Sequence, residues 1–217
     1  MKRPVIIIGS GGHAAVVADA LLLAGETVLG FTDPDASRHG TRICGMPVLG
    51  DDSALASLAP AEVLLANGIG GTGAGPAKEL RRDVQRRFES LGWTFAPVRH
   101  PSAVVSPFAQ VDASAQLFAR AVVQPGAHVG RGCIVNTGAI VEHDVVVGEF
   151  AHVSCGATLC GDVHVGAGSH IGAGAIVRQG VQLGEDSVVG AGAVMLETVA
   201  GGRTWIGVPA RERRVEA

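Results

Sequence analysis

The most constraining feature of this sequence is an aliphatic residue that returns at every sixth position across residues 105–195. The series is unbroken: Val105, Val111, Leu117, Val123, Val129, Val135, Val141, Val147, Val153, Leu159, Val165, Ile171, Val177, Leu183, Val189 and Met195. A period of six fits neither an α-helix nor a coiled coil. A fixed short period indicates a solenoid, and hexapeptide repeats are typical of a parallel β-helix.

A small or β-branched residue stands two positions before most of these aliphatic residues. The set is Ala109, Ala115, Ala121, Ala127, Cys133, Ala139, Val145, Ala151, Ala157, Val163, Ser169, Ala175, Val181, Ser187 and Ala193. The aliphatic residue and the small residue of each hexad point to the same side of a strand, because side chains alternate along it. Three hexads make a triangular coil of 18 residues, and about five such coils would stack along the segment.

The first part of the chain alternates predicted strands and helices. We expect a buried strand over 4–8, a helix over 12–24 that ends at Gly25, and a second strand over 27–32. A strand or loop near 46–49, a short helix opened by Asp51 or Asp52, and a strand over 62–66 follow. A basic amphipathic helix over 76–91, with Leu80, Val84 and Phe88 on one face, precedes a short strand over 93–95.

This alternation predicts a half-sized, Rossmann-like α/β domain with a short parallel sheet. The segment from Pro97 to Pro101 marks the junction, because the hexads begin directly after it. We therefore expect one domain over residues 1–97 and a β-helix domain over 98–217, which ends in a basic tail (Arg211, Arg213 and Arg214).

A glycine loop joins the first predicted strand to the first helix. It reads Gly9-Ser-Gly-Gly-His13-Ala14 and matches G-x-G-x-x-A, and Asp33 follows it at a spacing near that of a ribose-binding carboxylate. Three interpretations stay open: a turn without a ligand, a NAD site, and a nucleotide diphosphate on the helix N-terminus. The last is favoured, because the second mononucleotide half is missing and backbone N–H groups at a helix N-terminus bind anions.

Charge and composition exclude several classes of function. The net charge of −3 implies no general affinity for nucleic acid or for anionic membranes. We find no apolar run of transmembrane length, and the N-terminal apolar run ends in the glycine loop, unlike a signal peptide. The four cysteines form no C-x-x-C pair, so we expect a reduced, cytoplasmic protein.

The segment Glu142-His143-Asp144 breaks the apolar filler of the hexads. A histidine near a corner of the coil can act as a general base at neutral pH. A carboxylate from Asp144 or Glu142 would fix its tautomer and raise its basicity. The alternative is a solvated corner histidine.

The other histidines of the hexads fall into columns. His152 and His170 are 18 residues apart, and His128 and His164 are 36 apart, so we expect each pair to stack on one corner of the coils. His143 lies half a coil from His152, so the two would lie on different sides of one prism. They could meet only across a subunit interface or along a ligand.

Several segments resemble those of the bacterial hexapeptide-repeat sugar acetyltransferases, which include nucleotide-linked 4-amino-sugar N-acetyltransferases and sialic acid O-acetyltransferases. The resemblance covers essentially the whole chain and rests on Ile-Ile-Ile-Gly-Ser-Gly-Gly-His13, His100-Pro-Ser-Ala103, Asn136 to Asp144, Phe150-Ala-His152-Val and Gly207-Val-Pro-Ala210. It implies a left-handed β-helix. It also implies a homotrimer that uses acetyl-CoA at sites between neighbouring β-helices.

The resemblance also implies roles for single residues. His143 corresponds to the general base and Asp144 to the carboxylate that polarises it, with Glu142 beside them. His152 corresponds to a contact with acetyl-CoA near the thioester, and Ala173 and Ala191 to backbone contacts along the pantetheine arm. The nucleotide-sugar pocket in domain 1–97 would contain Gly11, Gly12, His13, Asp33, Pro34 and Gly68. The segment that follows Gly68, up to Gly75, is richer in glycine than the family's usual polar stretch.

The resemblance therefore implies an acetyl-CoA-dependent N-acetyltransferase that acts on the amino group of a UDP- or GDP-linked 4-amino sugar by direct transfer. One alternative is an O-acetyltransferase of sialic acid or another free sugar, and a further one is a non-catalytic β-helix binding protein. A histidine column could also suggest zinc, as in the hexapeptide-type carbonic anhydrases. No tight pair of ligand spacings recurs, so we expect no metal site. We also expect no nucleic acid or membrane partner.

Overall fold

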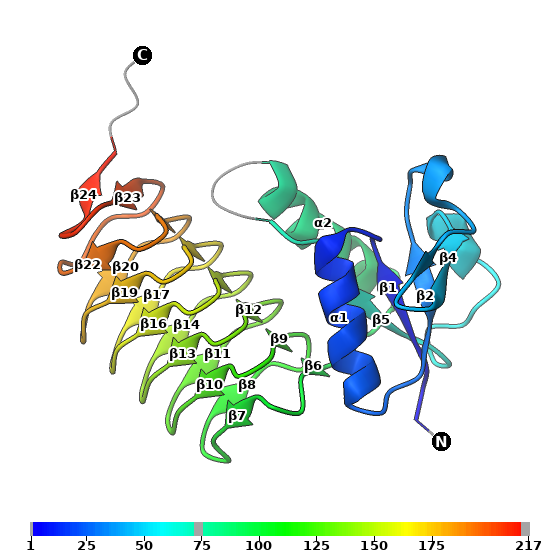
Figure 1. The fold of residues 1–217 in the computed structure, drawn as a ribbon, viewed down its shortest axis with the longest axis horizontal. Helices are drawn as coiled ribbons and strands as arrows, with labels where there is room; N and C mark the ends of the chain where they lie inside the picture. Colours follow the sequence, from blue (N-terminus) through cyan, green and yellow to red (C-terminus); the bar gives the residue numbers. More distant parts are fainter. Residues whose placement is uncertain (1, 72–75, 214–217) are drawn as a thin grey trace. The chain divides into compact units, whose positions relative to one another are not determined.

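The computed structural model describes residues 2–71 and 76–213 (Figure 1). The chain divides into two compact units, the first formed by the residues up to Gly71 together with Pro76–Pro101, and the second beginning at Ser102. The division therefore falls at the end of the Pro97–Pro101 segment. Thr72–Gly75 of the glycine-rich segment and Arg214 of the basic tail lie outside the described residues.

A mostly parallel sheet with the strand order β3-β4-β2-β1-β5 forms the centre of the first unit. Its parallel strands are β1 (Val5–Ile8), β2 (Val28–Thr32), β4 (Met46–Gly50) and β5 (Leu64–Asn67), and β3 (Arg42–Ile43) runs antiparallel to β4. The helices are α1 (Gly12–Leu23) and α2 (Pro76–Ser90), with short 3₁₀ helices η1 (Ala36–Arg38) and η2 (Asp52–Leu55), and β6 (Val98–Arg99) follows near the end of the unit.

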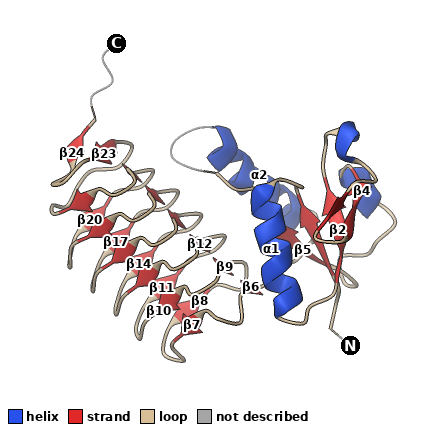
Figure 2. Ribbon diagram, in the orientation of Figure 1, coloured by secondary structure: helices blue, strands red, loops and turns tan. Residues whose placement is uncertain are grey.

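Strand β1 is buried on both faces, which explains its run of four apolar residues. Ile6 and Ile8 belong to a buried cluster with Phe88 of α2, while Ile7 points to the opposite face, where α1 packs (Figure 2). The α1 helix ends as expected at Gly25, which has a φ of +74°. The amides of Gly25 and Glu26 donate to the carbonyls of Leu22 and Leu21, which is the Schellman arrangement.

One expectation for this unit was wrong in detail. The segment 93–95 is not a strand: Phe95 makes a single bridge to Leu65, and Trp93 and Phe95 bury their rings in the core instead. On the predicted face of α2, Phe88 is buried and Val84 packs against the same core cluster, while Arg81 and Gln85 are buried as well. Leu80 is 52% exposed because it borders a cleft rather than the core.

The second unit is a parallel β-helix with three sheets, whose strands are two residues long except for β23. Sheet I contains β7 (Val104–Val105), β10 (Val122–Val123), β13 (Ile140–Val141), β16 (Thr158–Leu159), β19 (Ile176–Val177) and β22 (Val194–Met195). Sheet II contains β8 (Gln110–Val111), β11 (His128–Val129), β14 (Val146–Val147), β17 (His164–Val165) and β20 (Gln182–Leu183). Sheet III contains β9 (Gln116–Leu117), β12 (Ile134–Val135), β15 (His152–Val153), β18 (His170–Ile171), β21 (Val188–Val189), β23 (Thr204–Ile206) and, antiparallel to β23, β24 (Arg211–Glu212).

The hexad residues fill the interior of this prism, as predicted. Every aliphatic residue of the series from Leu117 to Met195 is buried, and Val105 and Val111 at the first coil pack against the same core. The small residues two positions earlier are buried with them. Neighbouring coils approach so closely that a Cβ atom on Gly148 would lie 2.6 Å from the amide nitrogen of Ala167. No helix among the described residues is long and apolar enough to span a membrane.

The buried hexad residues predict a large loss of stability on truncation. Leu159 is fully buried in the middle of the stack, so Leu159→Ala should lower the free energy of unfolding by about 2–5 kcal/mol. Leu196, which is 39% exposed in the same unit, is the matched control, and Leu196→Ala should change it by about 0.5 kcal/mol or less. Urea denaturation followed by circular dichroism measures both. Equal losses in the two variants would contradict the inward assignment.

Candidate active site

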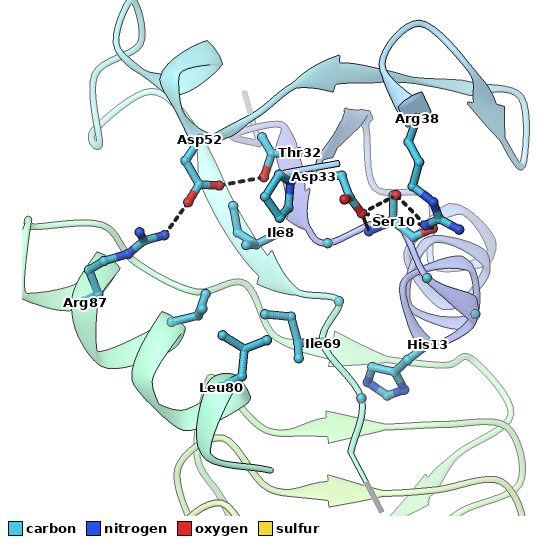
Figure 3. Close-up of a pocket in the computed structure, with 17 residues that line it drawn as sticks. Ile8, Ser10, His13, Thr32, Asp33, Arg38, Asp52, Ile69, Leu80 and Arg87 are labelled. Atoms are coloured by element: carbon cyan, nitrogen blue, oxygen red, sulfur yellow. Dashed lines mark hydrogen bonds and ion pairs between the residues drawn. The ribbon is translucent and has the colours of Figure 1, made fainter. Parts of the chain in front are cut away.

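A cleft of about 590 Å³ opens in the first unit at the carboxyl ends of its parallel strands (Figure 3). The glycine loop that follows β1, the residues after β2 and β4, and the loop after β5 all border it. Strand β1 lies between β2 and β5, so the strand order reverses here. Open α/β sheets bind ligands at such a switch point. The structure brings together all six residues expected in the substrate pocket: Gly11, Gly12, His13, Asp33, Pro34 and Gly68.

Glycines form part of the lining of the cleft. Gly11 is the N-cap of α1 and brings no side chain to the first amides of the helix. A Cβ atom on Gly68 would lie 2.7 Å from side-chain atoms of both Ala14 and Ile7. Glycine at this position therefore lets the loop after β5 approach α1. Backbone therefore forms part of the cleft wall, where it can come close to a ligand.

Asp33 is held in the cleft by a network of donors. Its carboxylate accepts hydrogen bonds from the hydroxyl and the amide of Ser10 and from the amide of Asp35. Arg38 lies 3.7 Å from the same carboxylate and donates to the Ser10 hydroxyl at 2.7 Å. Burial by itself raises the pKa of Asp33, but these hydrogen bonds and the Arg38 charge outweigh it and hold the pKa below its usual value. Asp33 is therefore an ionised acceptor at neutral pH.

Sequence inspection missed five polar residues that border the cleft. They are Ser10, Thr32, Arg38, Asp52 and Arg87. Asp52 accepts a hydrogen bond from Thr32 at 3.1 Å and pairs with Arg87 of α2. Ser10 and Asp52 could have been found, because each follows a parallel strand and such strand ends share one edge of the sheet. The two arginines carry no comparable signal, since only the folded chain brings them to that edge.

His143 lies in the turn between sheets I and II, with its side chain 55% exposed. Its Nδ1 atom is 2.9 Å from Oδ2 of Asp144. The hydrogen bond to Asp144 is the main cause that raises the pKa of His143, and the charges of Asp144, Glu142 and Asp162 act in the same direction. Glu142 does not bond the ring; its carboxylate accepts from the backbone amide of His143 at 3.4 Å. Asp144 is thus the carboxylate in contact with the imidazole.

The local backbone explains how Asp144 reaches the ring. Asp144 has a φ of +60°, in the left-handed region. Glycines such as Gly138 and Gly156 occupy the same position of other turns with similar φ values. Aspartate tolerates this conformation better than most residues with a side chain. The turn geometry therefore allows a carboxylate next to His143 without breaking the repeat.

The histidine columns form as expected, but on strands rather than at corners. His152 pairs with His170 on sheet III, with ring centroids 5.0 Å apart, and both are buried. His128 and His164 lie on strands of sheet II and are exposed. The hexad period alone does not reveal where the strand begins within each hexad. Asn136 lies 3.1 Å from Nε2 of His152, so donation from its amide leaves the proton of the neutral ring on Nδ1.

Ala173 and Ala191 lie in successive turns between sheets III and I, and both are exposed. The Ala173 carbonyl accepts the amide of Gly192 at 2.8 Å. His143 lies at the other edge of sheet I, between sheets I and II. Within one chain the structure therefore does not bring the expected base together with Ala173, Ala191 or His152. In the described part of the chain, no group of three or more His, Cys, Asp or Glu side chains could hold a metal ion.

Comparisons with known families and structures agree with this two-part architecture. The family model described as the PglD N-terminal domain matches residues 4–86. The model of the bacterial transferase hexapeptide (six repeats) matches residues 162–196. No match was found among curated proteins.

Solved structures match over nearly the full chain. The acetyltransferase domain of PglB from Neisseria gonorrhoeae FA1090 shares 34% sequence identity, with coverage of 98% of this chain and 100% of that chain and a TM-score of 0.90. A structure of that domain in complex with acetyl coenzyme A matches equally well. PerB from Caulobacter crescentus, solved with CoA and GDP-perosamine, shares 36% identity, with 97% of each chain covered and a TM-score of 0.88.

These matches confirm the predicted fold class, an α/β unit followed by a left-handed parallel β-helix. At this identity and coverage, the chain belongs to the family of hexapeptide-repeat sugar acetyltransferases that contains the PglB acetyltransferase domain and PerB.

Proposed function

We propose that this enzyme transfers the acetyl group of acetyl-CoA to the amino group of a nucleotide-linked amino sugar. One observation carries the proposal: the chain combines a cleft suited to a nucleotide diphosphate with an exposed histidine–carboxylate pair. PerB, a relative at 36% identity, was solved with CoA and GDP-perosamine. We assign residues 1–97 to the nucleotide sugar and residues 98–217 to acetyl transfer.

The cleft offers a complementary surface to each part of a nucleotide diphosphate. Backbone amides at the N-terminus of α1, at Gly12 and His13, favour phosphate oxygens. Arg38 adds a positive charge beside them. Asp33, with its lowered pKa, stays ionised and can accept hydrogen bonds from hydroxyl or N–H groups. Ile69 and Leu80 supply an apolar wall on which a base can pack.

His143 acts as the general base in this proposal. When the neutral ring donates from Nδ1 to Asp144, the lone pair of Nε2 is left to accept a proton. The sugar amine attacks the thioester carbonyl, a C–N bond forms, and Nε2 takes the amine proton. The C–S bond then breaks, and the thiolate of CoA leaves and takes the proton from Nε2 of His143, which restores the neutral base. His152 contacts the thioester end of acetyl-CoA, and Ala173 and Ala191 contact the pantetheine arm.

The placement of these residues favours a homotrimer with sites between subunits. In one chain, the base lies at one edge of sheet I, and the acetyl-CoA residues lie at the other edge or on sheet III. The outward positions of sheet I are mostly aliphatic, and Val104 and Ile176 are 63% and 44% exposed. The corresponding positions of sheet II are mostly polar: Gln110, His128, His164 and Gln182. An apolar row on one sheet is suited to a second copy of the chain.

The free cysteines support a reducing environment. Cys44, Cys133, Cys155 and Cys160 form no disulfide. We therefore propose that the enzyme works in the cytoplasm.

The proposed function predicts turnover that depends on both the amine and the nucleotide. Incubation with acetyl-CoA and a panel of UDP- and GDP-linked amino sugars should release free thiol, and mass spectrometry should find one acetyl group on the sugar nitrogen. The corresponding free nucleotide should compete with the sugar substrate. Thiol release with free sialic acid alone would instead indicate O-acetylation, and no acetyl-CoA binding would indicate a binding protein.

Removal of the proposed base predicts a large loss of rate. His143→Ala should lower kcat by roughly 10²–10⁴-fold while leaving the assembly and its melting temperature unchanged, because the side chain is largely exposed. His164→Ala, which removes an exposed histidine from sheet II, is the matched control and should retain kcat. Near-normal turnover of His143→Ala would remove His143 from the mechanism.

The pair with Asp144 predicts a defined change in pH dependence. Protonated His143 cannot accept a proton, so activity rises with pH through the raised pKa of His143. In Asp144→Asn the hydrogen bond to a charge is lost and the pKa of His143 falls towards its ordinary value. The acidic limb of the pH profile of kcat should therefore move to lower pH, with a lower plateau because the tautomer is no longer fixed. An unchanged acidic limb would show that Asp144 does not tune the base.

A further inference from the structure

A single glycine interrupts one position of the hexads. The first residue of each turn after a strand is Pro107, Ala113, Ala119, Pro125, Arg131, Thr137, His143, Glu149, Cys155, Gly161, Ala167, Ala173, Gln179, Glu185 and Ala191. Gly161 is the sole glycine in this series. It follows His143 by 18 residues, one full coil, so the two occupy equivalent places in successive coils.

The imidazole of His143 lies over this glycine. A Cβ atom on Gly161 would lie 2.5 Å from Nε2 and 2.6 Å from Cε1 of His143, closer than carbon atoms approach such atoms without displacement. The backbones are held together by the amide of Asp162, which donates to the His143 carbonyl at 3.0 Å. The ring is the end of a rotatable side chain, so the ring would move and the coils would stay in place.

Asp144, the partner of His143, also lies over a glycine of the adjacent coil. Gly126 lies one coil before Asp144, and a Cβ atom there would collide with the Asp144 carboxylate. Gly126 has a φ of +76°, so any substitution would also strain its backbone. Gly161 is not in the left-handed region. Alanine therefore suits the backbone at 161, which makes this position the clean test.

We propose that Gly161 is a positioning residue: its missing side chain leaves the space in which His143 keeps its bond to Asp144 and presents Nε2. This inference rests on the proposed role of His143 as the base. It also explains why one turn position that otherwise carries a side chain holds glycine here. A methyl group at this place would push the ring from Asp144 or cover the nitrogen that must accept the proton.

Gly161→Ala tests the proposal through the titration of His143. The imidazole signals of wild type and variant are followed by NMR against pH, without substrate, with His143→Ala used for assignment. We expect the pKa of His143 to fall in Gly161→Ala, because the ring loses the Asp144 hydrogen bond. We also expect kcat to fall roughly 10²-fold with little change in the KM of acetyl-CoA. Gln179→Ala, at the same turn one coil further, is the control and should change neither the pKa of His143 nor kcat.

Three results would overturn the proposal. The first is an unchanged His143 titration together with unchanged kcat. The second is an unchanged titration with a raised KM of acetyl-CoA, because Gly161 would then border the thioester. The third concerns stability. If Gly161→Ala lowers the melting temperature through a clash with the imidazole, adding His143→Ala must restore the melting temperature. A double variant whose melting temperature stays low would contradict a clash with the ring. The titration needs no substrate, so an inactive wild type would contradict the proposed function and not this inference.

Discussion

The structure depends on the parallel pairing of each strand with the strand one coil away. Ile140 pairs with Thr158 and His152 with His170, and each pair is 18 residues apart. The amides and carbonyls of successive coils are joined by hydrogen bonds such as that from Glu142 to Leu159. A two-residue strand could not persist alone, so the repeated pairing and the aliphatic interior stabilise each other. Because the pairing is regular, it assigns every side chain to a sheet or a turn.

This regularity explains how much the sequence predicts. The inward residues follow from the period and from the alternation of side chains, and the structure confirms them. The phase of the strand within the hexad does not follow from the period, so the histidine columns were expected at corners and lie on strands. In the α/β unit, the apolar residues Trp93 and Phe95 suggest a strand, yet their side chains are buried in the core without forming a paired strand. Arg38 and Arg87 reach the cleft only through folding, so no local pattern reveals them.

The same close packing shapes the chemistry of the turns. Where a turn contains glycine, the missing side chain leaves a shallow space on the surface of the stack. A side chain from the adjacent coil can fill this space. Phe150 places its ring where a Cβ atom of Gly132 would lie, and His143 does the same at Gly161. At Gly132, the aromatic ring of Phe150 fills the space and stabilises the stack. The space at Gly161 holds the exposed imidazole of His143 beside the Asp144 carboxylate. Solvent on its exposed side would otherwise leave the ring free to rotate.

One chain does not bring the proposed site together, because the pairing register separates His143, the proposed base, from the residues proposed to contact acetyl-CoA. We infer that His143 of one subunit works with His152 of its neighbour. The most direct measurement co-assembles His143→Ala with His152→Ala, each inactive alone, from denatured mixtures. Shared sites predict recovered acetyl transfer, roughly a quarter of the wild-type rate for random assortment in a cyclic trimer. Mixed assemblies that stay as inactive as either parent would contradict a site shared between subunits.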